Sequence, residues 1–245
     1  MNGEISGGDF YDEAVTAGYL SHRDSGVSSP NVVMEEPAVL AHLGDLTGQR
    51  VIDLGCGDGS FAGDVLARGA QAYLGVDGSP AMVAAAREQP ADDRVRFEVG
   101  RIEAFQPDPG AAELVTSRMA LHYLRDITPT LRSAHEALTE NGRLLFTVTH
   151  PVITSFDNRE PGPRTNWTVD DYFDAGERRR NWFGSEVTWF HRTVEQYISA
   201  VLAAGFIVEA VSECAPDPSL LADASEELAR RRRVPVILLV SALRR

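Results

Sequence analysis

The chain has 245 residues, 43% of them hydrophobic and 24% charged, a composition typical of globular proteins that excludes a disordered or low-complexity chain. With 36 acidic and 23 basic side chains the formal net charge is -13, which disfavours nucleic acid and anionic membranes as partners. All of the basic residues are arginines, and without a lysine the chain cannot be a Schiff-base aldolase, a pyridoxal-phosphate enzyme, a P-loop NTPase or a protein kinase.

Strand and helix signals alternate from residue 50 onward. Short apolar runs bounded by turn residues predict strands, and apolar residues spaced three or four apart predict the helices between them. The predicted strands are residues 50–54, 72–77, 94–99, 113–117, 143–149, 206–211 and 234–241. Because such alternation produces parallel strands joined by right-handed crossovers, we expect an α/β fold, a doubly wound sheet covered by helices on both faces.

Two of the predicted helices carry boundary signals. Ser79 and Pro80 form an N-cap and first-turn pair. Thr193 and Gln196 have the spacing of a capping box, and Gly205 is expected to end that helix.

Two segments lie outside the alternation of strands and helices. An N-terminal helix is predicted before the sheet, within residues 10–31, as a lid segment. Residues 150–192 hold eight of the 19 aromatic residues, including all three tryptophans, and we interpret them as a cap inserted after the fifth strand. These aromatic side chains would form either a small core of the cap or the wall of a substrate pocket. The whole chain, residues 1–245, is expected to be a single domain.

The two cysteines, Cys56 and Cys214, are too few for a disulfide framework or a zinc ribbon. The first residues show no basic stretch followed by an apolar one, and the apolar run at residues 234–240 is too short to span a membrane. We therefore expect a cytoplasmic protein with no membrane partner.

The turn after the first strand carries the main functional signal. Asp53 opens a D-x-G-x-G-x-G pattern, which differs from the dinucleotide pattern G-x-G-x-x-G because the third glycine comes one residue early and Ser60 stands in its place. Glycines let the main chain approach a ligand, and the following helix directs its N–H groups at negative charge. Asp77 ends the second strand 24 positions later, where a carboxylate can accept both hydroxyls of a ribose. Together these signals predict a ligand of the adenosine type.

Four stretches, VIDLGCGDG, LGVDGS, SRMALHYL and GRLLFTVTHP, make the chain similar to the class I S-adenosylmethionine-dependent methyltransferases over nearly its whole length. Three others, YFDAGERRRNW, HRTVEQYISAVLAAGF and SHRDSGVSSPN, resemble a bacterial small-molecule branch of that superfamily. The resemblance implies a Rossmann-like sheet of seven strands in the order 3-2-1-4-5-7-6, with the last strand antiparallel. It also implies S-adenosylmethionine as the cofactor.

The resemblance assigns cofactor roles to matching positions. Gly55 and Gly57 are expected to line the methionine end and Asp77 to bind the ribose, and Asp53, Cys56 and Gly78 are also expected to bind the cofactor. The others are Met82 on one face of adenine, Ile102 and Glu103 at its edge, Ser117, Met119 and His122 beside the cofactor, and Tyr19 and Arg23 at its carboxylate. Purely structural interpretations stay open for four of them. Asp77 and Glu103 could be solvated carboxylates, His122 could cap its loop, and Cys56 could pack between two glycines.

Methyl transfer from a sulfonium is an in-line displacement, so the protein chiefly orients the reactants and excludes water. A general base is needed only when the acceptor must lose a proton, and histidine is the usual residue near neutral pH. The candidate bases are His150 and His191, at the two ends of the cap, although either could be a structural loop residue. Tyr11, Tyr172 and Trp182 are candidate substrate contacts. No acidic pair follows the fourth and fifth strands, so no metal is expected.

We therefore expect an enzyme that transfers the methyl group of S-adenosylmethionine to N, O or C of a small, aromatic or heterocyclic metabolite. It would act as a monomer or homodimer. A nicotinamide-dependent oxidoreductase and a non-catalytic nucleoside-binding module are the alternatives. These residues determine neither the acceptor, nor the methylated atom, nor the use of a base.

Overall fold

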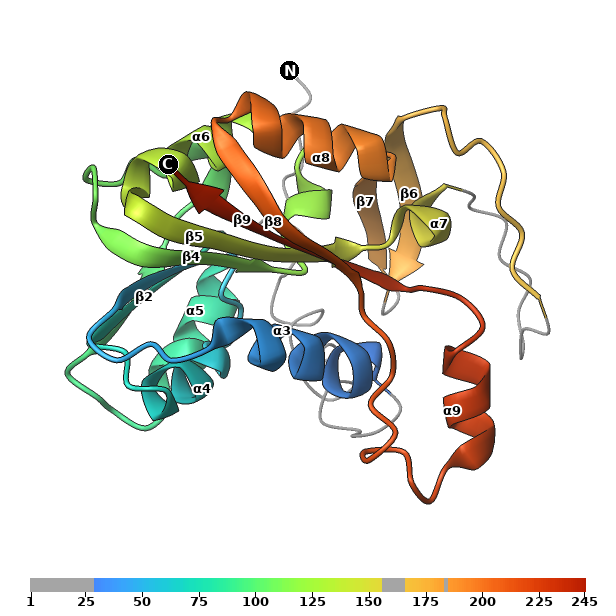
Figure 1. Ribbon diagram of the computed structural model, residues 1–245, viewed down its shortest axis with the longest axis horizontal. Helices are drawn as coiled ribbons and strands as arrows, with labels where there is room; N and C mark the ends of the chain where they lie inside the picture. The colour runs from blue at the N-terminus through green and yellow to red at the C-terminus, as the bar shows by residue number, and fades with distance from the viewer. Residues whose placement is uncertain (1–28, 156–165, 183–184) are drawn as a thin grey trace.

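A seven-stranded sheet in the order β3-β2-β1-β4-β5-β9-β8 forms the centre of the molecule (Figure 1). The structure is a computed structural model that describes residues 29–155, 166–182 and 185–245, so most of the expected N-terminal lid lies outside the described residues. The strands are β1 (Arg50–Leu54), β2 (Ala72–Asp77), β3 (Val95–Val99), β4 (Ala112–Arg118), β5 (Leu138–Thr149), β8 (Phe206–Glu213) and β9 (Ile237–Arg244).

The strand pairing confirms the order expected from the resemblance. Parallel pairs join β1 to β2 and β4, β2 to β3, and β4 to β5. The final strand, β9, runs antiparallel to both of its neighbours, β5 and β8. Because parallel strands end at the same edge, the turns that follow β1, β2, β4 and β5 meet on one side of the sheet, where open α/β folds bind their ligands.

Two strands begin three or more residues away from their predicted starts. β5 begins at Leu138, five residues before the predicted start, because the pairing with β4 jumps from Leu138 opposite Ala112 to Arg143 opposite Leu114. The extra residues include Asn141, whose φ of 63° lies in the left-handed region. β9 begins three residues late, at Ile237, which follows Pro235 and its missing main-chain donor.

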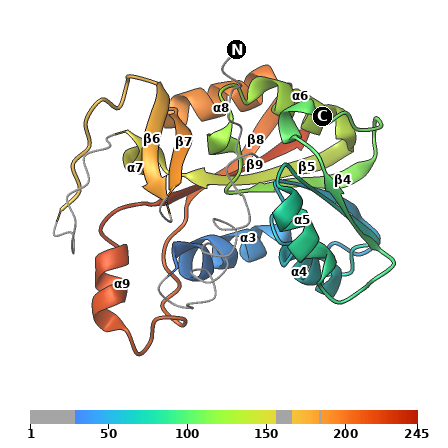
Figure 2. The same cartoon turned by 180° about the vertical axis from the view of Figure 1, so that it is seen from behind.

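Helices cover both faces of the sheet. α6 and α8 lie on one face, and α3, α4 and α5 lie on the other, as the two opposite views show (Figures 1 and 2). The helices and short helical turns are η2 (Asn31–Glu35), α3 (Glu36–Leu43), α4 (Phe61–Ala67), α5 (Pro80–Arg87), η3 (Ile102–Ala104), η4 (Leu121–Tyr123), α6 (Thr128–Ala137), α7 (Pro151–Thr154), α8 (Val194–Ala203) and α9 (Ser225–Arg231). Each face has its own cluster of buried apolar side chains, with Phe146 and Tyr197 in one and Val65 and Leu239 in the other.

The predicted helix boundaries are confirmed. Ser79 Oγ accepts the main-chain N–H of Met82 at 3.2 Å and so caps α5. At the start of α8, Thr193 Oγ1 accepts the N–H of Gln196 at 3.1 Å, and the Gln196 side chain accepts the N–H of Thr193 at 2.9 Å. Gly205 follows α8 with a φ of 97°, which favours glycine.

The inserted segment contains a hairpin that the sequence analysis did not predict. Strands β6 (Gly176–Trp182) and β7 (Ser185–His191) form a separate antiparallel pair, with Gly176 opposite His191. Together with α7 they lie between β5 and α8 in the chain, as expected for a cap. The ring of Trp189, 5% exposed, contacts that of His122 in an edge-on geometry with centroids 5.5 Å apart. The cap is thereby joined to η4, the turn that follows β4.

Truncation of a core aromatic side chain tests the packing of the sheet. Phe146 in β5 is 0% exposed and Phe173 in the cap is 88% exposed. We expect Phe146→Ala to lower the free energy of unfolding by about 3–5 kcal/mol, because it removes buried apolar contacts and leaves a cavity. The matched variant Phe173→Ala should change it by less than about 0.5 kcal/mol. Chemical denaturation of both variants makes the measurement, and similar losses would contradict the assigned core.

Candidate functional site

The glycine-rich turn after β1 is held against the end of β2. The main-chain N–H groups of Gly55 and Cys56 both donate to the carbonyl oxygen of Val76, at 2.7 and 3.1 Å. Gly55 has a φ of 84°, and a Cβ at this position would lie 2.4 Å from the Cβ of Ala120. No other residue fits there, because both the conformation and the space require glycine. The turn therefore presents bare main chain to the edge of the sheet where β1, β2 and β4 end.

The carboxylate of Asp77 fixes this turn from the neighbouring strand. Its Oδ2 accepts the N–H of Gly57 at 2.9 Å, and its Oδ1 accepts the N–H of Ser79 at 2.8 Å. Burial raises the pKa of Asp77, while the N–H groups of Ser79 and Gly57 act in the opposite direction. Each carboxylate oxygen has a second lone pair, so Asp77 can still accept hydrogen bonds from two ligand hydroxyls.

A cavity of about 320 Å³ lies at the carboxyl ends of β1 and β4. Five residues that the sequence analysis selected line it: Asp53, Gly55, Cys56, Gly57 and Met119. Other lining residues were missed by the sequence analysis: Glu35, Glu36, Asp58, Phe61, Asp64 and Arg118. The cavity is therefore mainly acidic, which suits a ligand that carries positive charge.

Asp53 lines this cavity and is 1% exposed. Its Oδ2 accepts the hydroxyl of Tyr73 at 2.6 Å, and its Oδ1 accepts the hydroxyl of Thr116 at 2.7 Å. Burial raises its pKa, although both hydroxyl groups and the nearby Arg118 oppose this shift. Both oxygens are thus held by neighbours on β2 and β4.

Arg118 and Glu35 form a bidentate ion pair beside Asp53. Nε of Arg118 donates to Oε1 of Glu35 at 2.9 Å, and Nη2 donates to Oε2. Glu35 Oε1 also accepts the hydroxyl of Thr147 at 2.9 Å, and that hydroxyl oxygen accepts the N–H of Met119 at 3.0 Å. Burial lowers the pKa of Arg118, but the charges of Glu35 and Asp53 outweigh it and raise the pKa above its ordinary value.

No local pattern in the sequence reveals this pair, because its members lie 83 positions apart. The η2 turn that carries Glu35 was not predicted either. The only sequence feature that could have pointed to this pair is the position of Arg118 between the predicted cofactor residues Ser117 and Met119.

Five other predicted cofactor residues, Ser117, Met82, Ile102, Glu103 and Gly78, do not line this cavity. Ser117 Oγ donates to the carbonyl oxygen of Leu54 at 2.8 Å and so links β4 to β1. Met82 and Ile102 are buried, at 3% and 7% exposure. Glu103 pairs with Arg101 at 3.0 Å, and Gly78 follows Asp77 directly. Tyr19 and Arg23 lie outside the described residues. The cofactor roles of all of these residues stay predictions.

His122 is 1% exposed and belongs to η4, the turn that follows β4. Its ring nitrogens are 3.5 Å from the main-chain N of Thr149 and 3.4 Å from the Thr149 hydroxyl oxygen. Its ring also contacts that of Tyr123, with centroids 4.4 Å apart. His122 is therefore packed where the end of β5, η4 and the cap meet.

His150 is buried at the start of the cap, and both of its ring nitrogens have protein partners. Nδ1 accepts the N–H of Val152 at 3.1 Å, so Nε2 carries the proton and donates to Glu213 Oε1 at 3.1 Å. Burial lowers the pKa of this imidazole, and the Glu213 carboxylate raises it. His150 thus caps α7, and its use as a general base stays a prediction.

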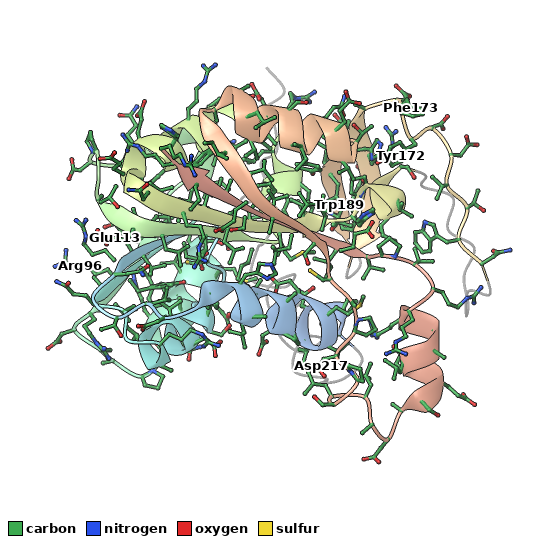
Figure 3. The ribbon with its side chains drawn as sticks, viewed as in Figure 1. Arg96, Glu113, Tyr172, Phe173, Trp189 and Asp217 are labelled. Atoms are coloured by element: carbon green, nitrogen blue, oxygen red, sulfur yellow. The ribbon has the colours of Figure 1, made fainter. Side chains whose placement is uncertain are left out.

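His191 occupies a similar position at the other end of the cap. Nε2 donates to the carbonyl oxygen of Tyr172 at 2.9 Å, so Nδ1 is the acceptor of the Thr154 hydroxyl at 2.7 Å. The Tyr172 ring packs edge-on against that of His191, with centroids 5.7 Å apart. Tyr172 lies at the same end of the molecule as Trp189 of β7 (Figure 3). Of the other predicted substrate contacts, Tyr11 and the side chain of Trp182 lie outside the described residues.

Within the described parts of the chain, no group of three or more His, Cys, Asp or Glu side chains could hold a metal ion. No helix among the same residues is long and apolar enough to cross a membrane.

Comparisons with known proteins identify the family. A family described as a methyltransferase domain matches residues 51–142. The crystal structure of an S-adenosylmethionine-dependent methyltransferase from Mesorhizobium loti is similar with a TM-score of 0.78 and 33% sequence identity, over 86% of this chain and 97% of that one. This chain belongs to the S-adenosylmethionine-dependent methyltransferases. The resemblance to class I enzymes and the expected cofactor are thereby confirmed.

Other relatives of the methyltransferase differ in how much of it they match. An uncharacterized protein of Haemophilus influenzae is 31% identical over 199 residues, which is 76% of this chain and 78% of that protein. The ribosomal protein L11 methyltransferase of Vibrio cholerae is 33% identical over 89 residues, only 36% of this chain and 30% of that enzyme. Relatives of the second kind share only part of the chain with the methyltransferase.

Substitution of Gly55 tests the geometry of the turn. Gly48, with a φ of 74° and no atom within 4 Å of a built Cβ, is a matched control. Gly48→Ala should lower the free energy of unfolding by about 1–2 kcal/mol through backbone strain alone. We expect Gly55→Ala to lower the free energy of unfolding by at least about 1 kcal/mol more than Gly48→Ala does, since the new methyl group must also displace Ala120. If chemical denaturation shows equal losses of stability in the two variants, Gly55 does not approach Ala120 as closely as the structure shows.

The buried His191 predicts a pH dependence of stability. Burial lowers its pKa, Arg178 and Arg192 add to this shift, and the Tyr172 carbonyl and Asp174 oppose it. A histidine whose pKa is lower in the folded state contributes full stability above its unfolded pKa of about 6.5, and this contribution is lost as the pH falls toward the folded value. We expect the free energy of unfolding to fall less between about pH 7 and about pH 5 in His191→Gln than in the wild type. Parallel pH profiles would show that His191 ionises equally easily in both states.

Proposed function

We propose that this methyltransferase transfers the methyl group of S-adenosylmethionine to N, O or C of a small, aromatic or heterocyclic metabolite. The observation that carries the cofactor half of the proposal is the Asp77 carboxylate, which holds the turn containing Gly55 and Gly57 and keeps lone pairs for two ribose hydroxyls. When bound, the cofactor supplies an activated methyl group on a sulfonium. The protein supplies orientation and a site from which water is excluded.

The residues present fit this cofactor. Gly55 and Gly57 line the cavity without side chains, so their main chain is open to the methionine end. The buried Met82 and Ile102 provide apolar contacts near Asp77 for adenine. Acidic residues dominate the cavity beside the glycine turn, and their charge favours a sulfonium over a neutral thioether.

The hydrogen bonds of the two candidate bases favour a reaction that relies mainly on orientation. His150 and His191 each have both ring nitrogens engaged by protein partners. Either would have to release a partner before accepting a proton from an acceptor. Correct alignment of two reactants can lower a barrier by about 7–11 kcal/mol without any proton transfer.

For the acceptor, we propose that residues 10–31 and the cap at residues 150–192 supply the walls of the pocket. The contact between Trp189 and His122 supports this, because it places the cap against η4, two residues beyond Met119 in the cavity wall. Tyr172 is half-buried beside His191 and provides a flat surface for a planar acceptor. Tyr11 and Trp182 stay candidates for the same role.

Two other functions are less well supported. A nicotinamide-dependent oxidoreductase would need a G-x-G-x-x-G turn, and this chain has Ser60 in place of the last glycine. A non-catalytic nucleoside-binding module would share the cofactor site but show no turnover of cofactor. Action on RNA or protein is not favoured either, because the net charge is -13 and the ribosomal protein methyltransferase of Vibrio cholerae shares only 36% of this chain.

Calorimetric binding of S-adenosylhomocysteine tests the cofactor site. We expect Asp77→Ala to weaken binding by about tenfold or more, equivalent to about 1.4 kcal/mol, because it removes the ribose acceptor and the support of the Gly57 turn. Asp92→Ala is the matched control, since Asp92 also accepts the N–H two residues later, that of Arg94 at 2.9 Å, but precedes β3 at the other end of that strand. Unchanged affinity in Asp77→Ala would remove Asp77 from the site, and binding of NAD in place of S-adenosylhomocysteine would favour the oxidoreductase.

A further inference from the structure

Both members of the ion pair between Arg118 and Glu35 line the cavity, but the cation is the more exposed of the two. The side chain of Arg118 is 20% exposed, whereas that of Glu35 is 1% exposed. Placing two charges in the interior costs desolvation energy that their mutual attraction often fails to recover. A buried pair whose cation is the more exposed member in a ligand cavity is therefore better explained by binding than by stability.

The guanidinium group is fixed in one orientation. Its Nε and Nη2 atoms hold the two oxygens of Glu35, and its Cζ lies 4.4 Å from the centroid of the Phe61 ring. Guanidinium has five N–H donors, and only two of them are used by these contacts. The other three have no hydrogen-bond partner among residues 29–155, 166–182 and 185–245.

Arg118 is also the only cation among the described residues that line the cavity. Glu35, Glu36, Asp53, Asp58 and Asp64 contribute carboxylates to the same wall. An anionic group that enters this cavity would be repelled by every charged neighbour except Arg118. The free edge of a guanidinium group matches a carboxylate, which it binds through two parallel hydrogen bonds.

We propose that Arg118, positioned by Glu35, binds the α-carboxylate of the methionine moiety of the cofactor. This inference rests on the proposed cofactor site, because the carboxylate is placed by Gly55 and Gly57, which line the same cavity as Arg118. The expectation from the sequence was that Tyr19 and Arg23 reach this carboxylate. The ion pair supplies a preorganised alternative within the described residues.

Glu35 acts through Arg118 and is a positioning residue. Thr147 donates to Glu35 Oε1 and accepts the N–H of Met119, so the η2 turn, β5 and the end of β4 are joined by one chain of hydrogen bonds. Met119 has a φ of 52°, an unusual conformation for a residue with a side chain. The same network therefore fixes both Arg118 and the cavity-lining residue that follows it.

The test compares three ligands by calorimetry. S-adenosylhomocysteine carries the carboxylate, its decarboxylated analogue lacks only that group, and 5′-methylthioadenosine lacks the whole amino-acid part. We expect Arg118→Lys to weaken binding of S-adenosylhomocysteine by about tenfold or more while changing the other two ligands by less than about twofold, since lysine keeps the charge next to Glu35 but loses the planar fork. Glu35→Gln should weaken binding of S-adenosylhomocysteine by a smaller factor, and it should also leave the two ligands without the carboxylate nearly unchanged.

Arg50→Lys is the matched control. Arg50 forms a bidentate pair with Glu113, with Nη2 to Oε1 at 2.6 Å and Nε to Oε2 at 3.2 Å, and this pair also joins β1 to β4. It lies at the start of both strands, and Glu113 is far from the cap in the structure (Figure 3). Arg50→Lys should leave the binding of all three ligands unchanged. The double variant Glu35→Gln/Arg118→Met leaves no unpaired buried charge, and it repeats the test if Arg118→Lys does not fold.

The three ligands distinguish a failure of the proposed cofactor site from a failure of the role proposed for Arg118. If the wild type binds neither S-adenosylhomocysteine nor 5′-methylthioadenosine, the proposed cofactor site itself is wrong. If Arg118→Lys lowers the affinity for all three ligands equally, the ion pair has only a structural role and the inference is overturned. Unchanged binding of S-adenosylhomocysteine in both variants, or a carboxylate-selective loss in Arg23→Met that Arg118→Lys does not show, would also overturn it.

Discussion

A single carboxylate joins the two turns that form the ligand crevice of this molecule. Asp77 accepts one N–H from Gly57, after β1, and another from Ser79, at the start of α5. It can reach both only because β1 and β2 are paired in parallel with Leu54 opposite Val76. A change of one residue in this register would move Asp77 to the opposite face of the sheet, since side chains alternate along a strand. The crevice therefore depends directly on the pairing of two buried strands.

Charge is distributed in the crevice so that acids dominate and one cation is held in place. Burial raises the pKa of Asp53 and of Asp77, while hydrogen bonds from Tyr73, Thr116, Ser79 and Gly57 oppose the shift. Such bonds leave the carboxylates fixed in position. A ligand with a sulfonium, an ammonium and a carboxylate carries net positive charge, so an acidic cavity with a single fixed guanidinium group matches it in sign and in arrangement.

The cap is attached to the sheet through polar groups as well as aromatic rings. His150 links α7 to the end of β8 through Glu213, and His191 links β7 to α7 and to the main chain at Tyr172. Histidines are well suited to such links because each ring provides one donor and one acceptor in its neutral form. Burial lowers the pKa of both residues and keeps them in that form near neutral pH. The start of the cap is thus fixed next to the sheet and its end is fixed to α7, while Trp189 contacts η4.

The amino-acid sequence by itself determined the seven strands of the main sheet, the boundaries of two helices and the kind of ligand. Alternating strand and helix signals and the D-x-G-x-G-x-G turn are local patterns, and local patterns fix main-chain conformation, as Ser79, Thr193 and Gly205 each show at a helix boundary. The strand order came from the resemblance and not from spacing. The early start of β5 was missed because it depends on pairing with β4 across the Asn141 irregularity.

Only the tertiary structure decided what the buried polar groups do. His150 and His191 are chemically equivalent candidates in the sequence, and their engagement by Glu213, Val152, Thr154 and Tyr172 depends on how the cap folds back. Glu35 and Arg118 are 83 positions apart and belong to no common pattern. The energy of such contacts comes from burial and from geometry in three dimensions, and neither quantity is encoded by spacing along the chain.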